Sequence, residues 1–195
     1  MASHPALLLA AFPPELAGLD RQPPTGWQVA CTGVGALAAA VATARLLVTL
    51  EPSRVLFVGT CGSYDERLAI GDFISASEAI ALSLDLVEGR AFRPGIEVSR
   101  WPATAPSPFP AHPVAVTPGV TATVAGAQRL AAHAAAEHLE LTGVFAACAA
   151  AGVPCAAALA VANRVGPEAH GEWQANHARL SRGLIAALRE QRVFD

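Results

Sequence analysis

The chain has 195 residues, which is enough for one well-packed domain and too few for two of ordinary size. It is 53% hydrophobic and 15% charged, its net charge is −3, and it contains arginine but no lysine. This balance argues against nucleic acid as a partner, because binding to phosphates requires a concentrated basic face. We expect a single domain over residues 1–195 with extensive buried surface.

The sequence also argues against a membrane protein. The longest apolar runs, such as Ala36–Leu50, contain an arginine or end before the roughly 20 residues that a bilayer span requires. The N-terminal apolar run lacks a basic start and meets Pro13 and Pro14, which is typical of a core strand and not of a signal peptide. The four cysteines have no CxxC spacing and lie in apolar segments, at Cys31, Cys61, Cys148 and Cys155. We expect a cytoplasmic protein with reduced thiols, no metal and no cofactor.

Short apolar runs alternate with longer helical runs along the chain. The predicted strands are Ala6–Ala11, Trp27–Thr32, Arg54–Gly59, Asp72–Ala79, Pro113–Thr117 and Pro154–Ala162. The predicted helices are Pro13–Leu19, Ala36–Leu50, Thr123–Ala135, Leu141–Ala151 and Glu172–Gln191, and the last of these is amphipathic. The alternation predicts a single α/β domain with a central, largely parallel, twisted mixed sheet flanked by helices.

The segment Glu88–His112 interrupts this alternation. It is rich in proline and contains Phe92, Arg93 and Trp101. Unstructured connections of this length in compact domains are usually functional or disordered. We expect the segment to run over one edge of the sheet, either as a solvated connection or as a lid over a pocket.

The first candidate site is a strand-to-helix turn that contains Gly33 and Gly35. Glycines here let backbone amides approach an anion or a sugar, and a helix N-terminus adds partial positive charge. The alternative is a tight turn that binds nothing. The turn is not a dinucleotide-binding fingerprint, because Ala38 stands where the third glycine would be.

The second candidate site is the GTCG turn at the end of a predicted buried strand. Its small residues, Thr60, Cys61 and Gly62, would let a flat ligand lie against the backbone. Asp72 follows at the start of the next strand. Its carboxylate is either catalytic or a turn cap.

The third candidate site combines Glu140 with Asn163. A carboxylate beside an apolar helix is costly unless it is hydrogen-bonded, so Glu140 either caps helix amides or accepts the protons of ligand hydroxyls. Asn163 follows a predicted strand at its carboxyl end, where open α/β sheets bind ligands. The pair would supply an acceptor for sugar hydroxyls and a combined donor and acceptor for the edge of a base.

Five motifs in order carry a family resemblance: TGVG, GTCGSYDERLAIGD, TPGVTATVAGAQRLA, EHLELTGVFAACAAAGVP and ANRVGPEAHGEW. They resemble the nucleoside phosphorylase and nucleosidase superfamily over nearly the whole chain, and within it the futalosine hydrolases. Trp173, seven residues after the glycine of the NxVGP motif, is typical of that branch. The resemblance implies that Glu140 binds ribose hydroxyls and that Glu15 helps to position an attacking water.

Departures from the family pattern favour one reaction over others. Phosphorylases that this chain resembles place a phosphate-binding arginine where Phe57 stands, so water is the expected nucleophile. Aminopurine-releasing relatives carry an aspartate where this chain has Asn163, which cannot act as a general acid but can hydrogen-bond N7 and a 6-oxo group. The arginine and serine that relatives place before that position are Leu159 and Ala162 here, and an aromatic platform near Val120 is missing.

The expected function is therefore hydrolysis of the N-ribosidic bond of a purine nucleoside, with futalosine as the expected substrate, in menaquinone biosynthesis. Asn163 and Glu15 are the expected catalytic residues. The expected substrate-binding residues are Glu140, Gly33, Gly35, Thr60, Cys61 and Gly62. The alternatives are a purine nucleoside phosphorylase, a nucleosidase of the methylthioadenosine and S-adenosylhomocysteine type, and a catalytically silent nucleoside-binding protein. The resemblance also implies a homodimer or a larger homo-oligomer.

Overall fold

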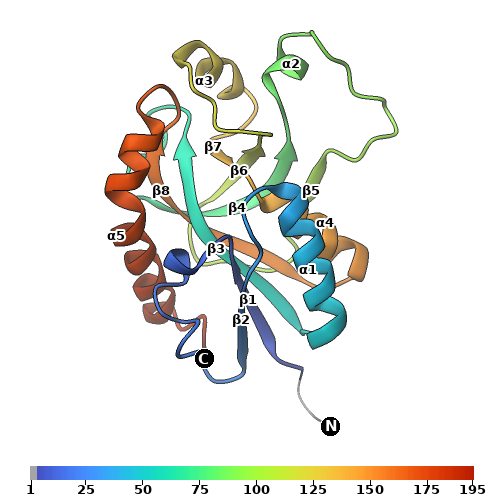
Figure 1. Ribbon diagram of the computed structural model, residues 1–195, viewed down its shortest axis with the longest axis vertical. Coiled ribbons are helices and arrows are strands. Elements are labelled where there is room, and N and C mark those ends of the chain that lie inside the picture. Colours follow the sequence, from blue (N-terminus) through green and yellow to red (C-terminus); the bar gives the residue numbers. More distant parts are fainter. Residues whose placement is uncertain (1–3) are drawn as a thin grey trace.

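Eight strands form one mixed sheet in the part of the chain that the structure, a computed structural model, describes, residues 4–195 (Figure 1). The strands are β1 (Ala6–Ala10), β2 (Trp27–Cys31), β3 (Arg54–Ser63), β4 (Phe73–Ala81), β5 (Arg100–Pro102), β6 (Ala111–Val116), β7 (Ala136–His138) and β8 (Cys155–Arg164). The helices are η1 (Pro13–Leu16), α1 (Ala36–Leu50), α2 (Leu84–Val87), α3 (Val124–Leu130), α4 (Leu141–Ala151) and α5 (Ala169–Glu190). The predicted α/β class is confirmed.

The sheet closes on itself around five of its strands. β3 pairs with β7 and β8, β8 pairs with β4, β4 pairs with β6, and β6 pairs with β7. β1 and β2 extend the sheet from β3, and β5 extends it from β4. Five of these pairings are parallel and three are antiparallel, so the predicted largely parallel mixed sheet is confirmed.

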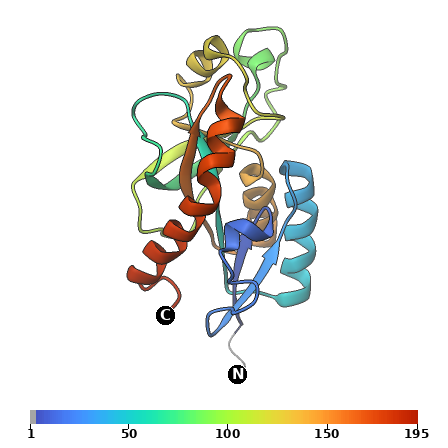
Figure 2. The same cartoon turned by 60° about the vertical axis from the view of Figure 1, so that its left-hand side comes forward.

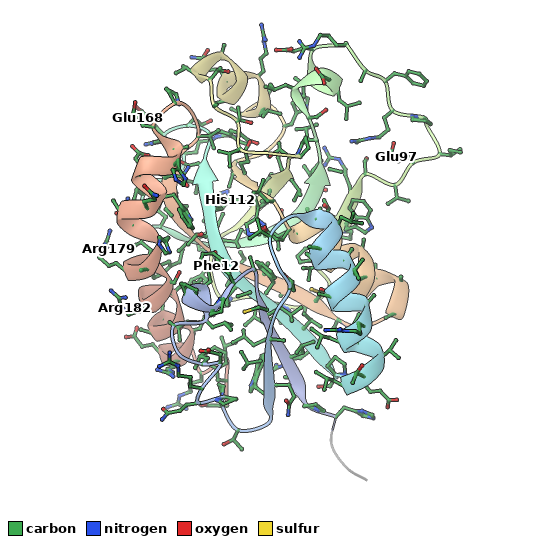
Figure 3. All side chains as sticks on the ribbon, in the orientation of Figure 1. Phe12, Glu97, His112, Glu168, Arg179 and Arg182 are labelled. Atoms are coloured by element: carbon green, nitrogen blue, oxygen red, sulfur yellow. The ribbon has the colours of Figure 1, made fainter. Side chains whose placement is uncertain are left out.

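The helices cover two faces of the sheet (Figure 2). Side chains alternate between the faces of a strand, and on β1 Leu7 and Leu9 join the core under α1 and α4 whereas Leu8 and Ala10 join the core under α5. On β8 the residues that face α5 are all alanines, Ala156, Ala158, Ala160 and Ala162. These small side chains allow α5 to lie close to the strand, with Leu184 and Leu188 buried against it and Arg179 and Arg182 pointing outward (Figure 3).

A glycine allows α4 to touch α1 directly. A Cβ atom at Gly143 would lie 2.0 Å from the carbonyl oxygen of Ala36 and 2.8 Å from the nitrogen of Ala40. Only glycine fits such a contact between backbones. The contact brings Glu140, at the start of α4, next to Gly35, at the start of α1.

Several predicted boundaries differ from the structure. The predictions for α1 and α4 are confirmed to the residue, but the predicted helix Thr123–Ala135 ends at Leu130 and is followed by the strand β7. Alanines around β7 favour a helix locally, and pairing with β3 and β6 overrides that preference. The predicted helix Pro13–Leu19 is a short 3-10 turn, because Ala17 adopts the left-handed conformation with φ of 49°.

The segment Glu88–His112 follows one edge of the sheet, as expected. It contains β5, which pairs antiparallel with β4. Within residues 4–195, no helix is both long enough and apolar enough to cross a membrane.

Candidate active site

A cavity of about 610 Å³ opens where β1, β3, β7 and β8 end. Phe12, two residues after the end of β1, lies at this edge of the sheet (Figure 3). Six of the predicted site residues line the cavity: Glu15, Thr60, Cys61, Gly62, Glu140 and Asn163. The carboxyl ends of parallel strands are the usual ligand site of such sheets.

Glu15 is a buried carboxylate at one end of the cavity. Its Oε1 atom accepts hydrogen bonds from the Thr60 N–H at 2.9 Å and the Thr60 hydroxyl at 2.8 Å. Its Oε2 atom accepts one bond, from the Ala11 N–H at 3.2 Å. Burial raises the pKa of Glu15 from its ordinary value of 4.5 to about 7 and Glu140 adds to the rise, although the Thr60 and Ala11 hydrogen bonds oppose it. The carboxyl group can therefore both hold and release a proton near neutral pH.

Glu140 is the second buried carboxylate of the cavity. Its side chain makes no capping hydrogen bond to its own helix; instead Oε1 accepts the N–H of Gly35 at 2.8 Å. Its Oε2 atom lies 3.1 Å from Nδ1 of His138, which also accepts the backbone N–H of Glu140. Burial lowers the pKa of His138 although the charge of Glu140 opposes this shift, so the ring is neutral. The Gly35 N–H occupies Oε1, so Oε2 is the oxygen of Glu140 with more capacity to accept from a ligand.

The backbone amides of the predicted glycine turn donate hydrogen bonds to other groups of the protein. The N–H of Gly33 donates to the carbonyl oxygen of Ala11, and that of Gly35 donates to Glu140. Of this turn, Val34 lines the cavity and the two glycines do not. A contact between these glycine amides and a ligand stays a prediction, and these hydrogen bonds do not favour it.

Asn163 lies beside Gly62 in the GTCG segment, which was predicted as a turn but belongs to β3, where pairing with β8 continues past a register shift between Cys61 and Gly62. Its Nδ2 atom donates to the carbonyl oxygen of Arg164 at 3.0 Å, and a Cβ atom at Gly62 would lie 2.7 Å from Nδ2, so a side chain at Gly62 would displace the amide. Oδ1 makes no hydrogen bond within residues 4–195, so the amide can still accept from a ligand and has one N–H left to donate. Cys61 lies beside it, and burial raises the pKa of its thiol far above the ordinary value, so it is not a nucleophile.

Two sequence features lie apart from the cavity. Asp72 is exposed and its Oδ2 accepts the Ala69 N–H at 2.7 Å, which is the turn-cap alternative. No residue of the segment 88–112 is among the described residues that line the cavity, so the structure does not place the segment over it.

Sequence reasoning missed several lining residues, namely Phe12, Glu137, His138, His170 and Trp173. Trp173 was marked only as part of a motif, and its position one turn into α5 brings it to the cavity. Its ring stacks on His177 with centroids 4.2 Å apart, and its Nε1 donates to the Thr60 hydroxyl. Glu137 gave no signal of its own, because its strand was not predicted.

Among residues 4–195, the lining of the cavity includes acidic side chains and no arginine. Glu15, Glu137 and Glu140 line the cavity. The chain has no lysine, and all of its arginines lie outside the cavity lining. Phe57 is fully buried, with its ring edge-to-face to His138 at 5.3 Å between centroids. Within residues 4–195, no three His, Cys, Asp or Glu side chains lie close enough together to hold a metal ion.

The chain belongs to the phosphorylase superfamily, whose family model matches residues 27–190. A curated relative, a 5'-methylthioadenosine/S-adenosylhomocysteine nucleosidase of Psychromonas ingrahamii, is 40% identical over 88 residues, which cover 44% of this chain and 36% of that protein. A second protein of the same description, from a Marinomonas species, is 34% identical over 37% of this chain and 31% of its own length. The matches thus span about a third of these relatives.

Solved structures resemble the chain over nearly its whole length. A futalosine hydrolase mutant of Helicobacter pylori superposes with a TM-score of 0.81 at 17% identity, covering 96% of this chain and 99% of that one. A 5'-methylthioadenosine/S-adenosylhomocysteine nucleosidase of the same organism superposes with a TM-score of 0.83 at 16% identity, covering 98% and 100%. At these identities the likeness establishes a shared fold.

Proposed function

We propose that the protein hydrolyses the N-ribosidic bond of a purine nucleoside. The observation that carries the proposal is a cavity lined by three carboxylates and no arginine, at the ligand-binding edge of a phosphorylase-superfamily sheet. In this reaction the water oxygen bonds to the anomeric carbon of the ribose as the bond to the base breaks. The sugar passes through an oxocarbenium-like state, and electrostatic stabilisation of that state is the main task of the site.

Glu15 is the proposed base that takes a proton from the attacking water. A general base is most effective when its pKa lies near the working pH, and that of Glu15 is about 7. The atom best suited to the task is Oε2, which has one hydrogen bond of 3.2 Å whereas Oε1 has two shorter ones. The base leaves as a hydrogen-bonded anion or a neutral tautomer.

Water is the proposed nucleophile because the cavity is unfavourable for a phosphate ion. A phosphate dianion would lose its hydration beside Glu15, Glu137 and Glu140 and find no guanidinium in return. Phe57, where the related phosphorylases place arginine, is sealed in the core. This argument disfavours the phosphorylase alternative.

Glu140 is proposed to bind the ribose hydroxyls through Oε2. Replacing Glu140 by Gln would leave one or two hydroxyls unpaired in a dry site, so we expect roughly a 10- to 100-fold loss of kcat/KM with little change in Tm. A large loss of Tm with unchanged turnover would show that Glu140 only joins α4 to α1 through Gly35.

Asn163 is proposed to select a 6-oxopurine, as in futalosine. Its amide can donate to N7 or O6 and accept from a protonated ring nitrogen, but it cannot deliver a proton as a carboxylic acid would. Asn163→Asp should therefore lower activity on the oxopurine and raise the relative activity on the aminopurine. Similar losses on both would indicate that Asn163 merely closes the strand-to-loop turn at the end of β8.

The second candidate substrate is an aminopurine thioether nucleoside. The named sequence relatives at 34–40% identity are 5'-methylthioadenosine/S-adenosylhomocysteine nucleosidases, and that description favours methylthioadenosine as a test substrate. A catalytically silent nucleoside-binding protein is a further alternative. Leu159 and Ala162 stand where relatives place an arginine and a serine, and both are fully buried and apolar.

One experiment separates these alternatives. The protein is incubated with inosine, futalosine, adenosine and methylthioadenosine, each with and without phosphate, and the released base and sugar are followed by chromatography. We expect hypoxanthine and free sugar without phosphate. Accumulation of ribose 1-phosphate would establish a phosphorylase, and tight binding without release would establish a binding protein.

A second copy of the chain is the proposed protein partner. Leu37, Val41 and Val48 lie exposed on α1, and Phe92 and Ile96 are exposed in the loop before β5 on the same side of the molecule (Figure 1). Large exposed apolar patches mark interaction surfaces. Light scattering should give twice the chain mass or more, and Leu37→Glu with Val41→Glu should reduce it; a monomeric unmutated protein would refute the oligomer.

A further inference from the structure

Two consecutive hydrogen bonds connect Glu15, through the Thr60 hydroxyl, to the indole N–H of Trp173. Nε1 of Trp173 lies 3.1 Å from Oγ1 of Thr60, and that atom lies 2.8 Å from Oε1 of Glu15. An indole N–H can only donate, so the Thr60 oxygen must accept this bond. The one hydroxyl proton of Thr60 is then left for Glu15.

We propose that Trp173 is a positioning residue for Glu15, and that it acts through the Thr60 hydroxyl to keep Oε2 as the basic atom. The inference rests on the proposed function, because it concerns the base of that reaction. With the Thr60 N–H and hydroxyl both on Oε1, the proton taken from water goes to Oε2, whose single hydrogen bond is the longest of the three.

The surroundings of Trp173 hold its ring in one orientation. Its ring is nearly parallel to that of His177, at 12°, and Phe12 contacts it with centroids 5.9 Å apart. Asn176, three residues further along α5, donates to the carbonyl oxygen of Ala162 and joins this turn of the helix to β8. A ring held by these contacts can orient a hydroxyl group at little entropic cost.

Among residues 4–195, Thr60 is the one side chain that donates a hydrogen bond to Glu15. The titratable groups around this corner of the cavity are Glu140 at the start of α4, Cys61 on β3, Cys31 on β2, His138 on β7, and His170 and His177 on α5. None of them hydrogen-bonds to Glu15 within residues 4–195, where its donors are Ala11 and Thr60. Loss of the Thr60 hydroxyl bond should therefore make Glu15 harder to ionise.

The test compares pH profiles of kcat/KM for four variants. Trp173→Phe keeps a ring and removes the N–H, Thr60→Val removes the hydroxyl, and Thr60→Ser keeps it. Trp101→Phe makes the same ring exchange in β5, away from the cavity. Thr60 hydrogen-bonds to Glu15, and Trp173 acts on Glu15 through Thr60, so each effect should be largest where Glu15 is protonated.

We expect the rise of kcat/KM with pH to move to higher pH. Thr60→Val should lose about threefold to tenfold at pH 6 and less at pH 8, and Trp173→Phe should move in the same direction by a smaller factor. Thr60→Ser and Trp101→Phe should keep the profile of the unmutated protein. An unchanged profile in both Trp173→Phe and Thr60→Val, even with lower activity throughout, would overturn the proposal and leave Trp173 a purely structural ring.

A second measurement keeps the inference separate from the proposed function. The carboxyl signal of Glu15 can be titrated by NMR in protein labelled with carbon-13 glutamate and assigned by its absence in Glu15→Gln. If no base is released from any nucleoside, the proposed function fails, and the titration still decides the inference. A higher midpoint in Trp173→Phe and Thr60→Val supports the positioning role, and an unchanged midpoint refutes it.

Discussion

Glu15 and Glu137 occupy two corners of the cavity that are built in the same way. Each buried carboxylate accepts both the N–H and the hydroxyl of one threonine, Thr60 for Glu15 and Thr121 for Glu137. Each takes a third bond from another group, the Ala11 N–H for Glu15 and the Tyr64 hydroxyl for Glu137.

The two corners differ in how the bonds are distributed. Thr60 places both of its bonds on Oε1 of Glu15, which leaves Oε2 with one bond of 3.2 Å. Thr121 divides its bonds between the two oxygens of Glu137, and Tyr64 adds another at 3.0 Å to Oε2. The same threonine motif can therefore leave one oxygen free for chemistry or satisfy both oxygens and anchor a loop. We expect Glu15 to matter for the reaction and Glu137 for stability.

The largest effect should follow from Glu15→Gln. The amide cannot take a proton from water, so kcat should fall about 100- to 10,000-fold, the usual contribution of a general base. Steady-state assays of base release measure this, with Glu137→Gln as the matched control because it makes the same change in the other corner. Equal losses in the two variants would break the comparison.

The pH dependence of stability should also separate the corners. The pKa of Glu15 is about 7 in the folded protein against 4.5 ordinarily, so between these values the folded state holds a proton that the unfolded state has lost. Stability from this group is present below pH 4.5 and is lost as the pH rises towards 7, by about 2 to 3 kcal/mol between pH 5 and pH 8. Urea unfolding at both pH values should show this loss in the unmutated protein and not in Glu15→Gln. An equal change in the free energy of unfolding between these pH values in both proteins would mean that Glu15 ionises as easily in the folded protein as in the unfolded chain.

The sequence predicted the frame of the molecule better than its cavity. Apolar periodicity and terminal glycines fix α1 and α4, since Gly35 and Gly152 lie at their ends. β7 has three residues and an alanine-rich approach, so its strand state depends on partners that are distant along the chain. With β7 unpredicted, Glu137 and His138 could not be assigned to the cavity.

The chemistry of the cavity arises from contacts between distant residues. Glu15 was identified through a family resemblance, and the pKa that suits it to catalysis follows from burial, which no local pattern shows. The Trp173 motif was visible, but its partner Thr60 is 113 residues away. Gly33 and Gly35 were expected to contact a ligand through their amides, yet Ala11 accepts the N–H of Gly33 and Glu140 accepts that of Gly35.

Glu137→Gln should lower stability more than activity. The change removes a charged acceptor from three donors in a buried site, at a cost of about 1 to 3 kcal/mol. Urea unfolding measures the cost, and kcat/KM of the folded variant should stay within about tenfold of the unmutated value because Glu15 keeps its bonds. A collapse of kcat with unchanged unfolding would reverse the roles of the two carboxylates.

The smallest effect should come from Tyr64→Phe, which removes one of the three bonds to Glu137 and keeps the ring. Thr121 still donates to both carboxylate oxygens, so the expected cost is about 1 kcal/mol, below that of Glu137→Gln.

Tyr64 is the single tyrosine of the chain, so its ionisation can be followed by ultraviolet absorbance without interference from another phenol. Burial and then the Glu137 charge raise the pKa of Tyr64 far above its ordinary value of 10, so tyrosinate should appear only as the protein unfolds at high pH. Tyrosinate formed while circular dichroism still reports a folded chain would show that the Tyr64 hydroxyl is open to solvent, and that Thr121 alone holds the Glu137 corner.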